Sequence, residues 1–164
     1  MEKLKALTAY LRNPAVLKRA GIQCHPENID SWVEKGDPEF LGDDTGGGID
    51  LFRHKYQCTI TFESVAGDIR NLIALVLIWL TLNDASRKGD LDDPGLSWEG
   101  EPFDHDTSDI SIELWFLETV HFEFVERSTG GAVGYKGGRH LKIGAGTEIA
   151  ADGFELPATE TEHG

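Results

Sequence analysis

The sequence predicts an α+β domain in which helices pack on one face of a mostly antiparallel sheet. Three observations lead to this prediction: an amphipathic N-terminal segment, two segments in which apolar residues alternate with polar ones, and a very apolar helix between them. A chain of 164 residues supports one domain, with room for an appended arm. With 40% hydrophobic and 27% charged residues, the composition excludes a wholly disordered protein.

The N-terminal segment predicts two short helices. Residues 3–12 carry leucines at intervals of three and four, which is the stripe of an amphipathic helix. Asn13-Pro14 ends this helix, because Asn13 can cap a second helix that has Pro14 in its first turn. Gly21 marks the end of the second helix.

Two strands are expected next, separated by a loop. Residues 29–33 indicate a short strand, and the Gly- and Asp-rich residues 36–49 are expected to form an irregular, mobile loop. Residues 54–63 alternate cleanly between apolar and polar side chains, which is typical of a half-buried strand.

A very apolar helix is predicted over residues 69–82, with Asp68 as its N-cap. Because this helix is apolar nearly all round, both of its sides should be covered. The sheet can cover one side, and the N-terminal helix or a neighbouring subunit can cover the other. The candidate core or interface residues are Leu72, Leu75, Val76, Trp79 and, on a later strand, Trp115.

The remaining elements are a loop over residues 83–95, a short strand starting at 96–98 and a strong strand pattern over 110–124. The last pattern fits one long strand or a hairpin. Glu118 lies on its apolar face, which favours a bend, bulge or hairpin there. Residues 128–164 hold nine glycines and form an arm rather than a second domain, with hints of order only near 140–143 and 148–150.

The charge of the chain is strongly negative, at −14. Residues 90–126 contain twelve acidic residues and no Lys or Arg. Such a field repels phosphate, which argues against nucleic-acid binding through a basic surface. Cys24 and Cys58 are too few for a disulfide scaffold and are expected to be thiols in a reducing cytoplasm, with one bridge left open. The longest apolar run, 72–80, is too short to cross a bilayer.

The sequence offers little support for catalysis. The acidic loop around His105, with Asp104, Asp106 and Asp109, could hold a divalent cation, but it matches no loop pattern of fixed ligand spacing. No serine lies in a GxSxG elbow, and the glycines at 130–134 lack the spacing of a phosphate-binding loop. A small metal-dependent α+β hydrolase that uses this loop remains the alternative to a protein without catalytic activity.

The order of the motifs resembles a known family. A helix broken at Asn13-Pro14 is followed by the strand YQCTITF (56–62), the helix GDIRNLIALVLIWLTLN (67–83) and the strand SDISIELWFLET (108–119). This order resembles the tail completion protein R family of contractile-tailed, Peduovirus-type bacteriophages, which is related to proteins of R-type phage-tail bacteriocins. The match covers roughly residues 5–126.

The resemblance implies a structural virion protein with a tail-terminator-like α+β fold over residues 1–127 and a flexible, Gly-rich arm over 128–164. It implies no catalytic residues, metal or cofactor. Proteins of this kind form a homo-hexameric ring at the neck end of the tail and contact tail tube, sheath and head-completion or connector proteins. DNA is then only passing cargo, no membrane is involved, and assembly takes place in the bacterial host cytoplasm.

Two hypotheses follow from the resemblance. The first is that a negative lumen keeps passing DNA from sticking to the wall of the ring. The second is that the arm orders against the sheath, the tube or a connector protein. The candidate channel-facing acids are Asp104, Asp106, Asp109, Glu113 and Glu123.

Overall fold

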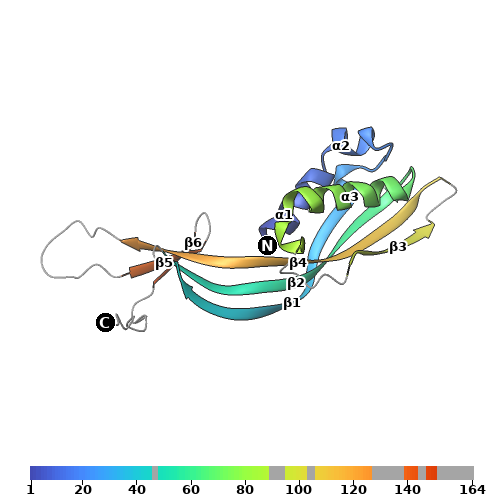
Figure 1. Cartoon of the computed structure of the whole chain (residues 1–164). Coiled ribbons are helices and arrows are strands. Elements are labelled where there is room, and N and C mark those ends of the chain that lie inside the picture. The colour runs from blue at the N-terminus through green and yellow to red at the C-terminus, as the bar shows by residue number, and fades with distance from the viewer. Residues whose placement is uncertain (46–47, 89–94, 103–105, 127–138, 144–146, 151–164) are drawn as a thin grey trace, which may run out of the picture. The chain divides into compact units, whose positions relative to one another are not determined.

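The computed structural model describes most of the chain as helices and strands (Figure 1). It forms two compact units, one made of Met1–Glu39 with Arg53–Glu118 and the other of Phe40–Phe52 with Thr119–Gly164. The described residues are 1–45, 48–88, 95–102, 106–126, 139–143 and 147–150.

The strands form one sheet in the order β1-β2-β4-β5-β6, and β3 pairs with β4. The pairs β3–β4, β4–β5 and β5–β6 are antiparallel. Side-chain contacts between β2 and β4 also run antiparallel, because Gln57 reaches Glu113 whereas Ser64 reaches Asp109. The strands are β1 (Ile29–Asp44), β2 (Gly48–Val65), β3 (Ser97–Pro102), β4 (Ser108–Glu126), β5 (Arg139–Ile143) and β6 (Thr147–Ala150).

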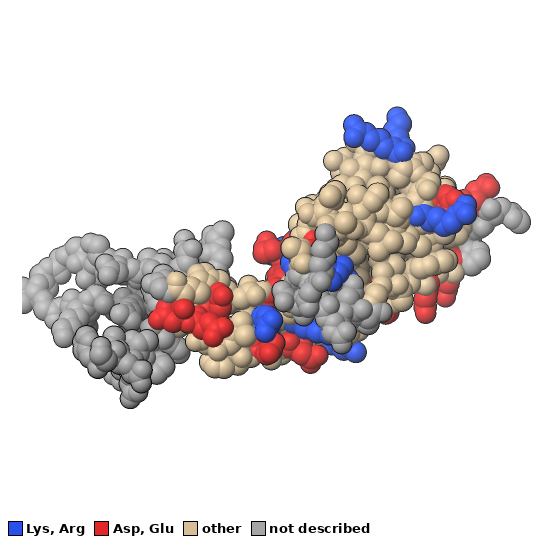
Figure 2. Space-filling model, viewed as in Figure 1, with Lys and Arg blue, Asp and Glu red and all other residues tan. Residues whose placement is uncertain are grey.

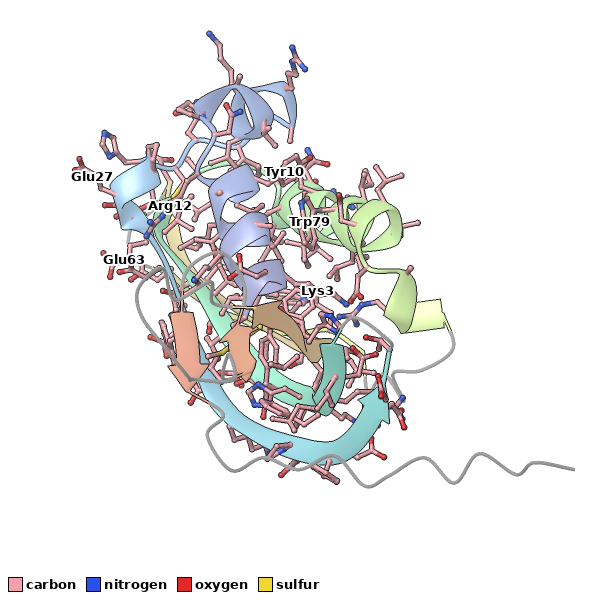
Figure 3. All side chains as sticks on the ribbon, turned by 90° about the vertical axis from the view of Figure 1, so that its left-hand side faces the viewer. Lys3, Tyr10, Arg12, Glu27, Glu63 and Trp79 are labelled. Carbon is pink, nitrogen blue, oxygen red and sulfur yellow. The ribbon has the colours of Figure 1, made fainter. Side chains whose placement is uncertain are left out.

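The helices α1 (Glu2–Leu11), α2 (Pro14–Arg19) and α3 (Ile69–Asn83) lie on one face of the sheet in the first unit (Figures 1 and 3). Short 3-10 helices span Pro26–Asn28 and Ala85–Lys88. This arrangement confirms the predicted α+β class. None of the helices in the described part of the chain is long and apolar enough to cross a membrane.

The core of the first unit lies between the helices and the inner face of the sheet, where alternate residues of β2 and β4 point. Trp79 of α3 packs edge-on against Phe116 of β4, with ring centroids 6.3 Å apart. The other main core residues are Leu4, Leu7 and Leu11 of α1, Leu72 and Val76 of α3, Tyr56, Cys58, Ile60 and Phe62 of β2, and Ile110, Ile112 and Leu114 of β4.

The helix boundaries agree with the capping residues that the sequence predicts. Asn13 Oδ1 accepts a hydrogen bond from the Ala15 N–H at 3.0 Å, and Asp68 Oδ1 accepts one from the Arg70 N–H at 2.9 Å. Gly67, just before α3, has φ +121°, and a Cβ there would lie 2.4 Å from the Gly21 carbonyl oxygen. Only glycine permits both this backbone conformation and this close approach.

The prediction of a loop over residues 36–49 was wrong, because β1 continues to Asp44 and β2 begins at Gly48. β1 is the edge strand of the sheet, and nearly all of its side chains beyond Val33 are exposed. Edge strands carry charged residues and Pro because these side chains discourage pairing with another chain. The polar composition that indicated a loop is therefore that of an exposed edge strand.

β4 is one continuous strand, so Glu118 marks neither a hairpin nor the end of the strand. The carboxylate of Glu118 lies on the inner face because it accepts hydrogen bonds from the first N–H groups of α1, described below. The hints of order near residues 140–143 and 148–150 correspond to β5 and β6. The remainder of the predicted arm, at 128–138, 144–146 and 151–164, lies outside the described residues.

Candidate functional site

The helix α3 has one buried and one exposed apolar side. Leu72, Val76, Trp79 and Leu80 are buried against the core, and Leu75 is partly buried against it. Leu77, Ile78 and Leu82 instead expose 47%, 52% and 77% of their area. These three residues form what we call the α3 apolar surface. Figure 2 shows that the molecular surface over α3 is largely uncharged. Exposed apolar residues gathered on one helix face make this surface a candidate for protein interaction.

Both ends of α3 are fixed by polar contacts, so the α3 apolar surface lies on a rigid element. Near the N-terminal end, Asn71 Nδ2 donates to the Ala20 carbonyl at 2.9 Å, which ties α3 to the end of α2. At the C-terminal end, Asp84 is the C-cap residue and its side chain is completely buried.

The buried Asp84 carboxylate is held by two cations. Lys3 Nζ donates to Asp84 Oδ1 at 2.6 Å, and Arg87 Nε donates to Oδ2 at 3.2 Å. The same cations reach β4, since Lys3 Nζ also donates to the Leu117 carbonyl at 2.7 Å and Arg87 donates to the Trp115 carbonyl. The network therefore joins α1, the end of α3 and β4, and Figure 3 shows Lys3 at the lower end of α1.

Glu118 of β4 caps the N-terminus of α1. Its carboxylate accepts hydrogen bonds from the Lys3 N–H at 2.8 Å, from the Glu2 N–H at 3.0 Å and from the Tyr56 hydroxyl. Burial alone would raise the pKa of Glu118, but these hydrogen bonds favour the charged form and lower it below 4.5. Burial and the hydrogen bond to Glu118 raise the pKa of Tyr56 far above its ordinary value.

The outer face of the sheet, opposite the helices, carries a groove of ≈ 410 Å³ that we call the acidic groove. All four strands of the first unit contribute to it. Thr61 and Ser111 lie on β2 and β4, and Trp32 of β1 is 44% exposed. Its carboxylates are Asp30 of β1, Glu63 of β2, Glu99 and Glu101 of β3, and Asp109 of β4.

Two of the groove carboxylates have partners within the fold. Asp30 Oδ1 accepts from the Arg12 guanidinium at 3.0 Å, and Asp109 Oδ1 accepts from the Ser64 N–H at 2.8 Å. Ser64 has φ 55°, so the Asp109 hydrogen bond holds an uncommon backbone conformation at the end of β2. Asp109 therefore has a structural contact besides contributing charge to the groove.

The structure brings together only some of the candidate channel-facing acids. Asp109 and Glu113 lie on the outer face of β4, where Glu113 accepts a hydrogen bond from Gln57 at 3.1 Å. Asp106 is exposed beside a separate pocket that contains Trp98. Asp104 and the side chain of Glu123 lie outside the described part of the structure. Trp115 lies on the outer face, with the ammonium groups of Lys35 and Lys55 each 5.4 Å from its ring centroid.

The loop of the alternative metal-dependent function lies mainly outside the described residues, which leave out His105 as well as Asp104. In the described ranges, no three His, Cys, Asp or Glu side chains are grouped so as to hold a metal ion. His121 forms a pair with Asp50 in the second unit, with Nδ1 2.7 Å from Oδ1.

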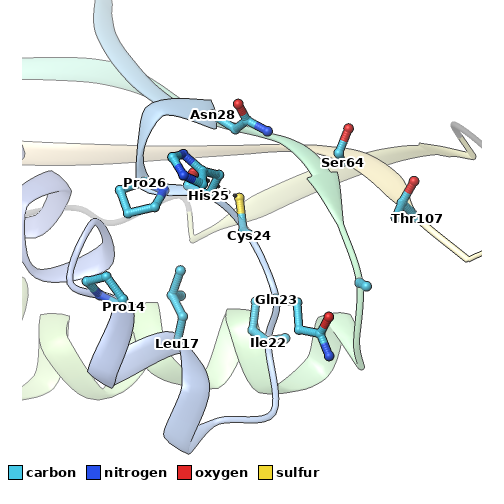
Figure 4. Close-up of a pocket in the computed structure, with 11 residues that line it drawn as sticks. Pro14, Leu17, Ile22, Gln23, Cys24, His25, Pro26, Asn28, Ser64 and Thr107 are labelled. Atoms are coloured by element: carbon cyan, nitrogen blue, oxygen red, sulfur yellow. Dashed lines mark hydrogen bonds between the residues drawn. The ribbon is translucent and has the colours of Figure 1, made fainter.

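The two cysteines are free thiols. Cys24 lines a pocket of ≈ 580 Å³ between α2, the segment that precedes β1, and the end of β2 (Figure 4). Burial, together with the charge of Glu63, raises the pKa of Cys24 to about 11. Cys58 is buried in the core, and burial raises its pKa to about 12. Both are therefore protonated at neutral pH, whereas a nucleophilic cysteine needs a lowered pKa.

The sequence analysis did not identify Asp30, Trp32 and Glu63 as parts of a shared site. The signal that could have found them is strand alternation, which places Asp30 and Trp32 on one face of β1 and Thr61 and Glu63 on one face of β2. Their proximity also depends on the order of the strands, which the local pattern does not contain.

The family model described as P2 phage tail completion protein R (GpR) matches residues 1–142. No curated protein and no solved structure matches the chain.

Proposed function

This chain belongs to the P2 phage tail completion protein R (GpR) family, and from that premise we propose that it caps the end of the tail tube and sheath as a ring of identical copies. The chain is a phage tail completion protein and thus a component of the virion tail. In the proposed ring it provides the surface for head-tail joining at the neck, and it works through protein contacts rather than catalysis.

The observation that supports this proposal is the α3 apolar surface. Three aliphatic side chains that are 47–77% exposed on one helix stabilise an isolated copy little, whereas their burial against a neighbouring copy stabilises the contact between the two. Membership of the family supports a role at the phage tail, and the α3 apolar surface offers a contact through which copies can associate. We assign it to the contact between neighbouring copies.

The other expected partners remain part of the proposal. They are the tail tube and sheath proteins and the head-completion or connector proteins, while DNA is passing cargo. Within the chain, residues 1–127 act as the ring-forming domain and residues 128–164 as an arm that contacts one of these partners. Assembly would take place in the cytoplasm of the bacterial host.

The double variant Ile78→Gln/Leu82→Gln tests the role of the α3 apolar surface. These residues are one helical turn apart, and Gln preserves helix formation. We expect self-association to weaken at least ~10-fold, because removal of central apolar contacts at an interface costs about 1–2 kcal/mol each. The solution mass is measured by light scattering over a range of concentrations. Purified protein is then added to tails assembled without it, and tails joined to heads are counted by electron microscopy.

The matched control is Lys5→Gln, which changes an exposed residue of α1 outside the α3 apolar surface. This variant should assemble and complete tails as the wild type does. Urea unfolding should show that both variants keep their stability to within about 1 kcal/mol. A folded Ile78→Gln/Leu82→Gln protein that assembles and completes tails normally would contradict the assignment of this surface.

A further inference from the structure

Two exposed cations lie at the C-terminal turn of α2. Lys18 and Arg19 are both exposed, and Figure 2 shows Lys and Arg gathered over α2. Of the Lys and Arg side chains that the structure describes, these two alone form neither an ion pair nor a contact with an aromatic ring. The helix dipole favours cations at this end, but it satisfies them only in part.

The acidic groove holds the complementary charges. Asp30 and Asp109 have partners in the fold, but Glu63, Glu99 and Glu101 form no ion pair with the described residues. Like charges held around one groove repel one another, so an incoming cation relieves this repulsion. Trp32 adds an exposed aromatic ring, on which a guanidinium can stack.

The two sets of charges lie on opposite sides of the first unit. α2 belongs to the helix layer (Figure 1), whereas the acidic groove is lined by side chains on the outer face of the sheet. Because the sheet separates them, they cannot meet within one copy, but they can meet between two copies. A contact that joins different surfaces of identical chains repeats from copy to copy and closes into a ring when the rotation allows.

We propose that the acidic groove receives the end of α2 of a neighbouring copy, with Lys18 and Arg19 facing Glu63, Glu99 and Glu101. This inference rests on the proposed ring and names the surface of the neighbour that the helix layer meets. It differs from the hypothesis that the outer acids form a wall facing DNA. A repelling wall requires only negative charge, whereas this groove combines carboxylates with an exposed tryptophan in a recess.

Charge reversal provides the test. In Lys18→Glu/Arg19→Glu the α2 end is acidic, and in Glu99→Lys/Glu101→Lys two of the three groove carboxylates that form no ion pair with the described residues become ammonium groups. We expect each variant alone to associate at least ~10-fold more weakly than the wild type, because like charges then face each other across the contact. In an equimolar mixture, the acidic α2 end of one variant meets the lysines in the groove of the other, and the native α2 end meets a native groove. The mixture should therefore regain the wild-type mass in sedimentation velocity experiments.

The control is Asp37→Lys/Asp43→Lys, which changes the net charge as much as the groove variant does but alters exposed acids farther along β1, at least five residues beyond Trp32 and thus more than about 15 Å along the strand. Association of this control should change less than ~3-fold at physiological ionic strength, because exposed charges farther than a Debye length are screened. If the control variant and Glu99→Lys/Glu101→Lys weaken association equally, total charge alone matters, as it would for a wall facing DNA. This result would overturn the proposal.

The remaining outcomes separate this contact from the proposed function. If the reversed groove weakens assembly but the reversed α2 does not restore it, other cations occupy the groove and the proposal is wrong. If none of the charge reversals changes association, the proposed contact is wrong, but the proposed ring is not contradicted. If the wild type stays monomeric at every concentration and also on isolated tails, the ring is wrong, and this contact with it.

Discussion

Asp84→Ala is expected to lower the free energy of unfolding by about 3–5 kcal/mol, which is a large part of the stability of an ordinary domain. The Asp84 side chain is completely buried, and its two oxygens pair with Lys3 and Arg87. Removal of the carboxylate leaves two cations close together, with side chains that are only 25% and 15% exposed. Their repulsion also disturbs the hydrogen bonds to the Leu117 and Trp115 carbonyls. Urea unfolding at neutral pH measures the loss.

Two comparisons make this expectation specific. Asp37→Ala removes an exposed aspartate from β1 and should change stability by no more than about 0.5 kcal/mol. Lys3→Met leaves Asp84 paired with Arg87 and should cost less than Asp84→Ala. A loss below about 1 kcal/mol for Asp84→Ala would show that water or a rearranged side chain replaces the carboxylate, and that the network does not secure the end of α3.

The sequence could predict those features that depend on neighbours along the chain. Asn13 and Asp68 were identifiable as caps, because an N-cap bonds an N–H group within its own first turn. The alternation in β2 and β4 and the apolar pattern of α3 were readable for the same reason. Asp84 was assigned to a loop, because its partner Lys3 is distant in sequence and nothing local indicates a buried charge.

The same distinction, between features set by neighbours along the chain and features set by distant residues, applies to the candidate surfaces. The apolar character of α3 predicted that something must cover its second side, and the structure leaves Leu77, Ile78 and Leu82 exposed there. The acidic groove was not predicted, because it requires β1, β2, β3 and β4 to lie in a given order. Strand order is set by long-range pairing, and only residues 29–33 of β1 were predicted as a strand, because the rest of β1 has the polar composition of an exposed edge strand.

Glu118→Gln is expected to lower the free energy of unfolding by about 2 kcal/mol at pH 7, because charged acceptors make the stronger hydrogen bonds. The carboxylate accepts from the Glu2 and Lys3 N–H groups and the Tyr56 hydroxyl while its side chain is 14% exposed. An amide has one oxygen to accept these bonds and brings donors that face other donors. The N-terminal turn of α1 should therefore fray in this variant.

The pH dependence distinguishes this role from simple packing. The pKa of Glu118 is lowered from 4.5 in the folded protein, so its charge stabilises the fold above that value. The stabilisation is lost as the pH falls through the lowered folded pKa. The wild type should thus exceed Glu118→Gln by a constant amount between pH 7 and about 5.5, and the difference should shrink below about pH 4.5. Because the other acids titrate in both proteins, the difference isolates Glu118. A difference that stays constant down to about pH 3 would contradict the capping role, since packing alone does not titrate.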